Sequence, residues 1–164
     1  MFPHTLVIGL GNPIVGDDGV GWRVAECILQ QMQESGIKPD EVDIECIAVG
    51  GLRLMEFMVG YDYAIVIDML TTGQQPTGYV SCFPLEDLPD LAVGHITSIH
   101  DTSLQSALKL GHKLGLHLPQ RIIVVGIEAN NSYNFSEELT PPIEAAIPQA
   151  VQVVIQLITN RSLN

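Results

Sequence analysis

Three side chains that lie far apart in the sequence could together do metal chemistry. Asp18 follows an apolar run and a glycine-rich turn, Asp68 closes a second apolar run, and His100 ends a long loop before a helix. Two carboxylates and one imidazole make an incomplete ligand shell for a divalent transition metal, with positions left for water or a substrate. We therefore expect Asp18, Asp68 and His100 to form one site.

Each of these residues also has a purely structural interpretation. Asp17 and Asp18 stand where a helix begins, so one of them can cap its free N–H groups while the other is available for chemistry. An Asp at a strand end is often a cap, and a His before a helix often pairs with a carbonyl group. Three other histidines compete for the role: one lies in the same loop and two look like surface residues (His95, His112 and His117).

Two further kinds of site find little support in the residues. The turn at Gly9 and Gly11 lies between a strand and a helix, but a dinucleotide fingerprint requires glycine where Ile14 stands. The two acids that follow would also repel a pyrophosphate. A serine nucleophile is disfavoured because the sequence holds no G-x-S-x-G motif.

The elements that must position these side chains follow from the hydrophobic pattern. Apolar runs and alternation predict strands at 4–9, 42–49, 63–68, 78–83 and 121–127. Helical spacing predicts helices at about 19–35, 52–58, 100–115 and 141–158. Residues 84–99 form a long connection that we expect to border the site. The alternation predicts one domain over 1–164, a three-layer α/β/α fold with a mainly parallel, twisted five-stranded sheet.

This topology explains how residues so distant in sequence can meet. The carboxyl ends of parallel strands share one edge of an open sheet, and ligands bind at that edge. Asp18 follows the first strand and Asp68 closes the third, so both belong there.

Composition limits the partners. The chain has 164 residues, 46% of them hydrophobic, and a formal charge of −12. Such an acidic surface is unsuited to nucleic acid or to anionic membranes, and it suits a basic partner or a bound cation. We also expect no secretory leader and no membrane span, because no apolar run approaches the roughly 20 residues required. Three scattered cysteines favour reduced thiols and a cytoplasmic location.

Five short motifs resemble, in the same order, those of the hydrogenase maturation endopeptidases. The first is the stretch Gly9–Gly21. It is similar to a family pattern in which G-x-G-N is followed by any four residues, then by D, then by either E or D, and finally by G-hydrophobic-G. The others are the strand before Asp68, the loop His with its flanks, a late strand that reads V-V-G-I-E and the L-T-P that opens the last helix (Ala64–Asp68, Ser98–Asp101, Val124–Glu128, Leu139–Ile143).

The resemblance implies a specific activity. These enzymes remove a C-terminal extension from the large-subunit precursor of a [NiFe] hydrogenase after nickel has been inserted. Carried over singly, the family's metal-contacting residues are Asp18, Asp68 and His100. The nickel would be supplied by the precursor rather than held permanently, and the enzyme would be of the aspartyl-protease type. The sequence gives no oligomeric state, and we expect a monomer. The general base stays open between Asp18, the first choice, and Asp68.

The sequence departs from the family's pattern at two positions. Members often carry D-G-G-x-x-G after the second strand, and here Cys46 stands in place of that acid. Asp18 replaces the commoner Glu, which shortens the side chain by one methylene. The role that the acid after the second strand has elsewhere is therefore not carried over to Cys46.

Two other functions stay open beside the protease. One is a metallohydrolase that brings its own zinc, and the other is a nickel-sensing or delivery module that does not cut.

Overall fold

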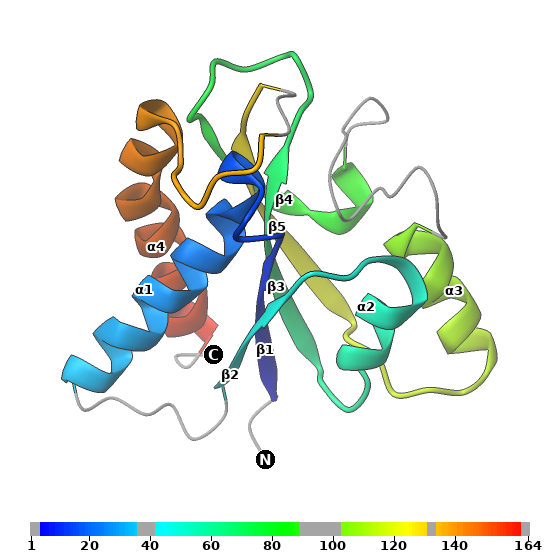
Figure 1. Cartoon of the computed structure of the whole chain (residues 1–164). Helices are drawn as coiled ribbons and strands as arrows, with labels where there is room; N and C mark the ends of the chain where they lie inside the picture. Colours follow the sequence, from blue (N-terminus) through cyan, green and yellow to red (C-terminus); the bar gives the residue numbers. More distant parts are fainter. Residues whose placement is uncertain (1–3, 36–41, 89–102, 131–133, 162–164) are drawn as a thin grey trace.

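A five-stranded sheet lies at the centre of the molecule, between two layers of helices (Figure 1). The computed structural model describes residues 4–35, 42–88, 103–130 and 134–161. Within them the strands stand in the order β2-β1-β3-β5-β4. Their bounds are Thr5–Leu10 for β1, Val42–Ile47 for β2, Tyr63–Leu70 for β3, Val80–Pro84 for β4 and Arg121–Glu128 for β5.

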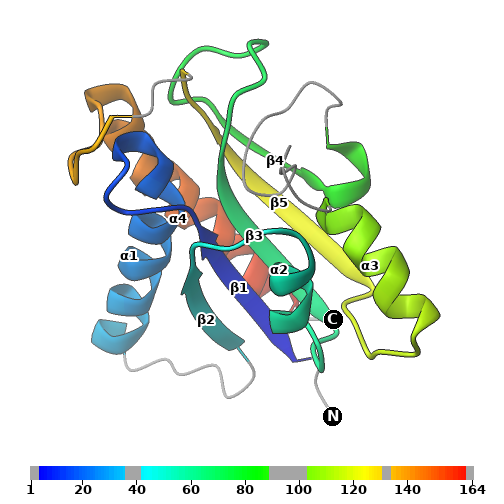
Figure 2. The same ribbon diagram turned by 45° about the vertical axis from the view of Figure 1, so that its right-hand side comes forward.

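The helices divide between the two faces of the sheet. Figures 1 and 2 show α1 (Val20–Ser35) and α4 (Pro141–Arg161) side by side on one face, with α2 (Gly51–Phe57) and α3 (Leu104–Lys113) on the other. Side chains of β3 alternate between two separate cores, as the period of a strand requires. The prediction of an α/β fold with helices on both faces of the sheet is confirmed.

The sheet is mixed rather than purely parallel. β1 pairs with β2 and β3 in parallel, β3 pairs with β5 in parallel, and β4 runs antiparallel to β5 at one edge. The physical reason lies in the connection from β3 to β4, residues 71–79. A parallel return needs a crossover of a dozen or more residues, so this short segment can only turn the chain back.

The chain changes direction across the sheet between β1 and β3. From β1 it passes through α1 to β2 on one side, then through α2 to β3 on the other side of β1. Strand ends at such a reversal point leave a crevice, where open α/β sheets bind their ligands. The short 3-10 helix η1 (Gly16–Gly19) follows β1 and contacts β3 at this point.

Several element boundaries differ by a few residues from those predicted. β3 continues two residues beyond Asp68, which therefore lies inside the strand rather than at its end. Pro84 ends β4, and η2 (Leu85–Asp87) follows where a loop was expected. α3 begins at Leu104 and is capped by Ser103, whose hydroxyl accepts a hydrogen bond from the N–H of Ser106 at 3.3 Å. The predicted start of that helix and most of the 84–99 connection lie outside the described residues.

α4 corrects the expectation that no segment has the length and composition of a membrane span. In the described part of the chain it is the one helix that meets this test, with a mean hydropathy of 1.2 over Pro141–Asn160. Its inner side is nevertheless buried against the sheet through Ile143, Ala150 and Val154. Packing as a core helix accounts for this apolar composition.

Candidate functional site at the carboxyl edge of the sheet

Glycines allow the first turn of α1 to lie directly on the sheet. A Cβ on Gly21 would come well inside 3.0 Å of the carbonyl oxygens of Leu10 and Ile67, which belong to β1 and β3. A Cβ on Gly9 would collide with Gly21 and Ala25 in the same way. The glycine-rich motif therefore serves close packing of helix on strand. The result is that η1 and its two acids sit at the ends of β1 and β3.

Asp18 is held in place by the turn that precedes it. Its side chain is buried, with the residue 6% exposed, and its Oδ2 accepts a hydrogen bond from the backbone N–H of Asn12 at 2.8 Å. Gly11 has a φ of 130° and would clash with the Asp18 carbonyl if it carried a Cβ. The turn thus closes tightly around Asp18 and orients its carboxylate.

Asp68 lies in the strand beside this turn. It is fully buried, and its neighbours on the same side of β3 are Ala64, Val66 and Leu70, which belong to the core beneath α2 and α3. An ionisable side chain inside a central strand is costly to bury, and such positions are retained mainly for specific polar roles.

Two of the three predicted site residues therefore belong to one edge of the sheet. Asp18 lies in η1, just after β1, and Asp68 lies near the carboxyl end of β3, two residues before it ends. His100 lies outside the described residues, as does His95. His112 and His117 are exposed, as expected for surface residues. The Nε2 atom of His117 lies 2.9 Å from Oδ1 of Asp62. Across the ranges that the structure describes, no three His, Cys, Asp or Glu side chains gather as a metal shell.

Asp17 plays a role that the sequence interpretation missed. It does not cap α1; it binds the start of α4 instead. Its Oδ1 accepts the backbone N–H of Thr140 at 2.6 Å and its Oδ2 accepts the Thr140 hydroxyl at 2.8 Å. The D-D-G and L-T-P motifs, 123 residues apart, are thus joined by two hydrogen bonds. Both motifs were visible in the sequence, but nothing there indicated that they touch.

Glu128 makes a matching arrangement on the other side of the site. This buried carboxylate accepts the N–H groups of Thr72 and Gly73 at 2.8 and 2.9 Å, and the Thr72 hydroxyl at 2.8 Å. These bonds fix the turn that follows β3, four residues after Asp68. Asp17 and Glu128 each bind one threonine through both its backbone N–H and its hydroxyl. Asp17 adjoins Asp18 in the chain, and the turn that Glu128 binds follows Asp68.

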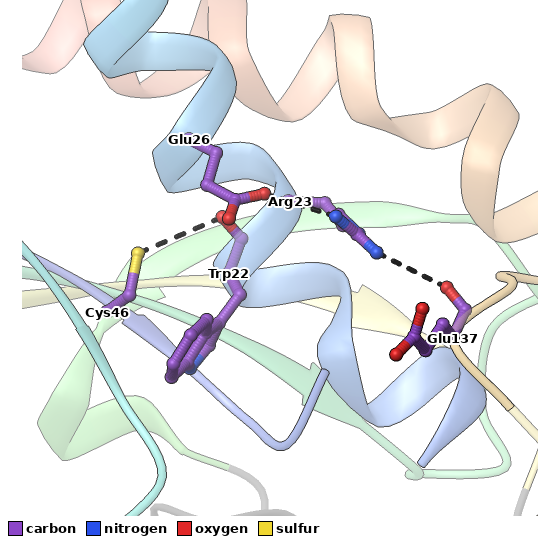
Figure 3. Close-up of polar contacts among 5 residues, drawn as sticks. All are labelled: Trp22, Arg23, Glu26, Cys46 and Glu137. Carbon is purple, nitrogen blue, oxygen red and sulfur yellow. Dashed lines mark hydrogen bonds and ion pairs between the residues drawn. The ribbon is translucent and has the colours of Figure 1, made fainter. Parts of the chain in front are cut away.

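Cys46, which replaces the acid of the family's pattern, is a neutral thiol. It donates a weak hydrogen bond from Sγ to the carbonyl of Trp22 at 4.0 Å (Figure 3). Burial raises the pKa of the Cys46 thiol, and the nearby carboxylates of Glu26 and Glu45 raise it further. This position therefore carries no negative charge at neutral pH, unlike the aspartate usual there.

Comparison with known proteins gives a consistent picture. The family model described as "Hydrogenase maturation protease" matches residues 25–157. The chain is 29% identical over 152 residues to the "Hydrogenase 2 maturation protease" of Escherichia coli, covering 93% of this chain and 88% of that protein. It is 28% identical to the "Hydrogenase expression/formation protein HupD" of Rhizobium leguminosarum, covering 95% and 74%.

Solved structures extend the likeness to the fold. The hydrogenase maturating endopeptidase HybD from E. coli superposes with a TM-score of 0.77 at 25% identity, covering 96% of this chain and 93% of that one. A hydrogenase 2 maturation peptidase from a Thaumarchaeota archaeon gives a TM-score of 0.65 at 30% identity, covering 94% and 97%.

Proposed function

Because the chain belongs to the hydrogenase maturation protease family, and so hydrolyses a peptide bond, we propose that it removes the C-terminal extension of a [NiFe] hydrogenase large-subunit precursor. We propose further that Asp18, Asp68 and His100 contact nickel already held by that precursor. The observation that carries this proposal is the position of Asp18 and Asp68, two buried carboxylates at the β1–β3 edge where this fold binds ligands.

Recognition of substrate-held nickel would make the metal both an anchor and a checkpoint. A precursor without nickel lacks the central contact, so discrimination requires no pocket for each side chain of the extension. Contact with the metal would also place one peptide bond beside the carboxylates, which lowers the entropic cost of reaching the transition state.

Hydrolysis would then follow the chemistry of carboxylates. Asp18 takes a proton from a water molecule, the resulting hydroxide adds to the peptide carbonyl, and the proton passes to the departing amine as the C–N bond breaks. The hydrogen bond from Asn12 holds the Asp18 carboxylate in place for this transfer. Asp68 is the second candidate for the base.

Location and stoichiometry follow the same reasoning. Cys27, Cys46 and Cys82 are free thiols, which suits a reducing compartment, and we propose that the protein acts in the cytoplasm as a monomer on one precursor.

The direct test compares nickel-loaded and nickel-free precursor. Each is incubated with the purified protein, and intact mass reports the C-terminus. We expect loss of the extension only from the loaded form. Absence of cleavage in both would overturn the proposed function, and equal cleavage of both would overturn nickel recognition. Zinc that stays with the protein stoichiometrically after dialysis would favour the self-contained metallohydrolase instead.

Substitution of the proposed histidine tests the site itself. His100→Ala should abolish processing of the loaded precursor, since one of three nickel contacts is lost. The matched control is His112→Ala, which changes an exposed histidine on α3 and should leave processing unchanged. Normal processing by the His100→Ala variant would reject this site.

A further inference from the structure

An aromatic side chain stands almost completely in solvent beside the candidate site. Phe135 is 91% exposed, the highest value among the large hydrophobic residues of the described chain. Ile14, in the turn that leads to Asp18, is 48% exposed. Backbone pairing joins the two segments, because Val15 and Ser136 form a parallel bridge whose register sets Ile14 beside Phe135. We call this pair the apolar ridge.

The ridge is held rigidly. Gly16 donates its N–H to the Ser136 carbonyl at 2.6 Å, and Ser136 donates its own to the Ile14 carbonyl at 3.1 Å. On the other side, the guanidinium of Arg23 donates to the carbonyl of Glu137 at 3.3 Å (Figure 3). An aromatic ring on a backbone fixed in this way loses little conformational entropy when a partner covers it.

The same connections fix the ridge relative to Asp18. Ile14 precedes Asp18 by four residues in one turn, and the segment that carries Phe135 ends at Thr140, which Asp17 binds through both carboxylate oxygens. A partner that covers the ridge is therefore brought to the edge of the sheet where Asp18 lies.

Charge indicates what kind of surface would fit. Glu137 and Glu138 follow Phe135 and are exposed. The guanidinium of Arg23 forms an ion pair with Glu26 and donates a hydrogen bond only to the backbone carbonyl of Glu137. It therefore does not neutralise the carboxylates of Glu137 and Glu138. The complementary surface is an apolar pocket edged by lysine or arginine side chains.

We propose that Phe135, supported by Ile14, is the anchor by which the enzyme docks on the precursor protein, in an apolar pocket with a basic rim. This inference rests on the proposed function, and it adds a protein contact outside the nickel site. Exposed aromatic residues at the centre of an interface often carry most of its binding energy.

The test uses Phe135→Ala in the full chain with nickel-loaded precursor. We expect kcat/KM to fall at least about thirtyfold, mainly through KM, because docking and not chemistry is weakened. The matched control is Leu114→Ala, which removes another exposed apolar side chain (68%) at the C-terminal end of α3, a helix on the face of the sheet away from α1 and α4. That control should keep wild-type kcat/KM.

A binding measurement separates this inference from the proposed function. Loaded precursor is passed over immobilised protein, and dissociation should be faster from Phe135→Ala by a similar factor. If wild-type protein binds the precursor without cutting it, the proposed function is wrong, but the dissociation rates of wild type and Phe135→Ala can still be compared to test docking. Binding and KM within about twofold of wild type for Phe135→Ala, or a loss confined to kcat, would overturn the docking role.

Discussion

In the described part of the chain, four buried carboxylates lie near the carboxyl edge of this sheet, and hydrogen bonds give two of them a structural role. Asp17 and Glu128 receive donors on both of their oxygens, from the backbone and hydroxyl of one threonine each. Hydrogen bonds of this kind account for burial without any catalytic task. Asp18 and Asp68 are the two that the resemblance also marks, and the two threonine-bound acids fix the segments around them.

Cys46 allows a test of charge at the departure from the family's pattern. Its pKa is raised, so the thiolate should appear only above the pH at which an ordinary cysteine ionises. We expect slow alkylation by iodoacetamide near neutral pH, with a rate that rises as pH approaches the raised pKa. Glu26→Gln removes one repelling carboxylate and should shift this profile to lower pH.

Peptide mass mapping checks this profile for each cysteine separately. The matched control is Glu34→Gln, which changes another acid on α1 that does not contribute to the raised pKa. A Cys46 profile that Glu26→Gln leaves in place would show that Glu26 does not raise the pKa, and that burial and Glu45 account for it.

At this scale the sequence allowed the types of residue to be predicted better than their partners. Asp17 and Asp18 are adjacent, so pattern alone could assign either one to a cap. Only the fold shows that Asp17 turns to Thr140, 123 residues away, rather than to the helix that follows it. The sequence showed Glu128 only as part of a motif and did not show its partner. The turn at Thr72 reaches Glu128 because β3 and β5 pair side by side in the sheet.

Among the elements, the contact of α1 with β1 and β3 decides where the candidate site can be. Gly9 and Gly21 remove the side chains that would separate helix from sheet, and Trp22 then donates from Nε1 to the last carbonyl of β2 at 3.1 Å. Ile47 also accepts the N–H of Gly11, so the end of β2 is tied to the turn that holds Asp18.

Gly21→Ala should disrupt this arrangement. The new methyl group would meet two backbone carbonyls that cannot move aside independently, so α1 must shift away from the sheet. We expect a loss of roughly 2–3 kcal/mol or more in the free energy of unfolding, together with loss of processing. Urea unfolding provides the measurement.

Gln33→Ala provides the control, because it places alanine at an exposed position of the same helix and should change stability by less than about 0.5 kcal/mol. Equal stability of the two variants would show that α1 can pack on the sheet without this close approach.

Element types followed well from hydrophobic periodicity, and element ends did not. The runs of β3 and β5 are buried along almost their whole length, so their pattern is unmistakable. The direction of β4 depends on the length of the segment before it, and the last two residues of β3 depend on pairing with Ile127 and Glu128. Neither feature is encoded in a local pattern.

For the whole molecule, the dominant property is negative charge. Nineteen acidic residues against seven basic ones give a formal charge of −12, and two of those acids, Glu137 and Glu138, closely follow Phe135 of the apolar ridge. A protein of this charge approaches a basic surface faster than a neutral one would, and salt screens the attraction. The charge thus bears on how quickly the enzyme and its proposed precursor meet, and the proposed nickel contact bears on the cleavage that follows.

We therefore expect kcat/KM on the loaded precursor to fall as the salt concentration rises from about 0.05 to about 0.5 M. Screening weakens attraction between the acids beside Phe135 and the basic rim proposed for the precursor, so the loss should appear in kcat/KM with kcat nearly constant. The double variant Glu137→Gln, Glu138→Gln should start lower and depend less on salt. Glu144→Gln, an acid in the first turn of α4, is the matched control and should retain the wild-type slope. A kcat/KM that rises with salt would instead mean that like charges meet at this interface, which contradicts a basic docking surface.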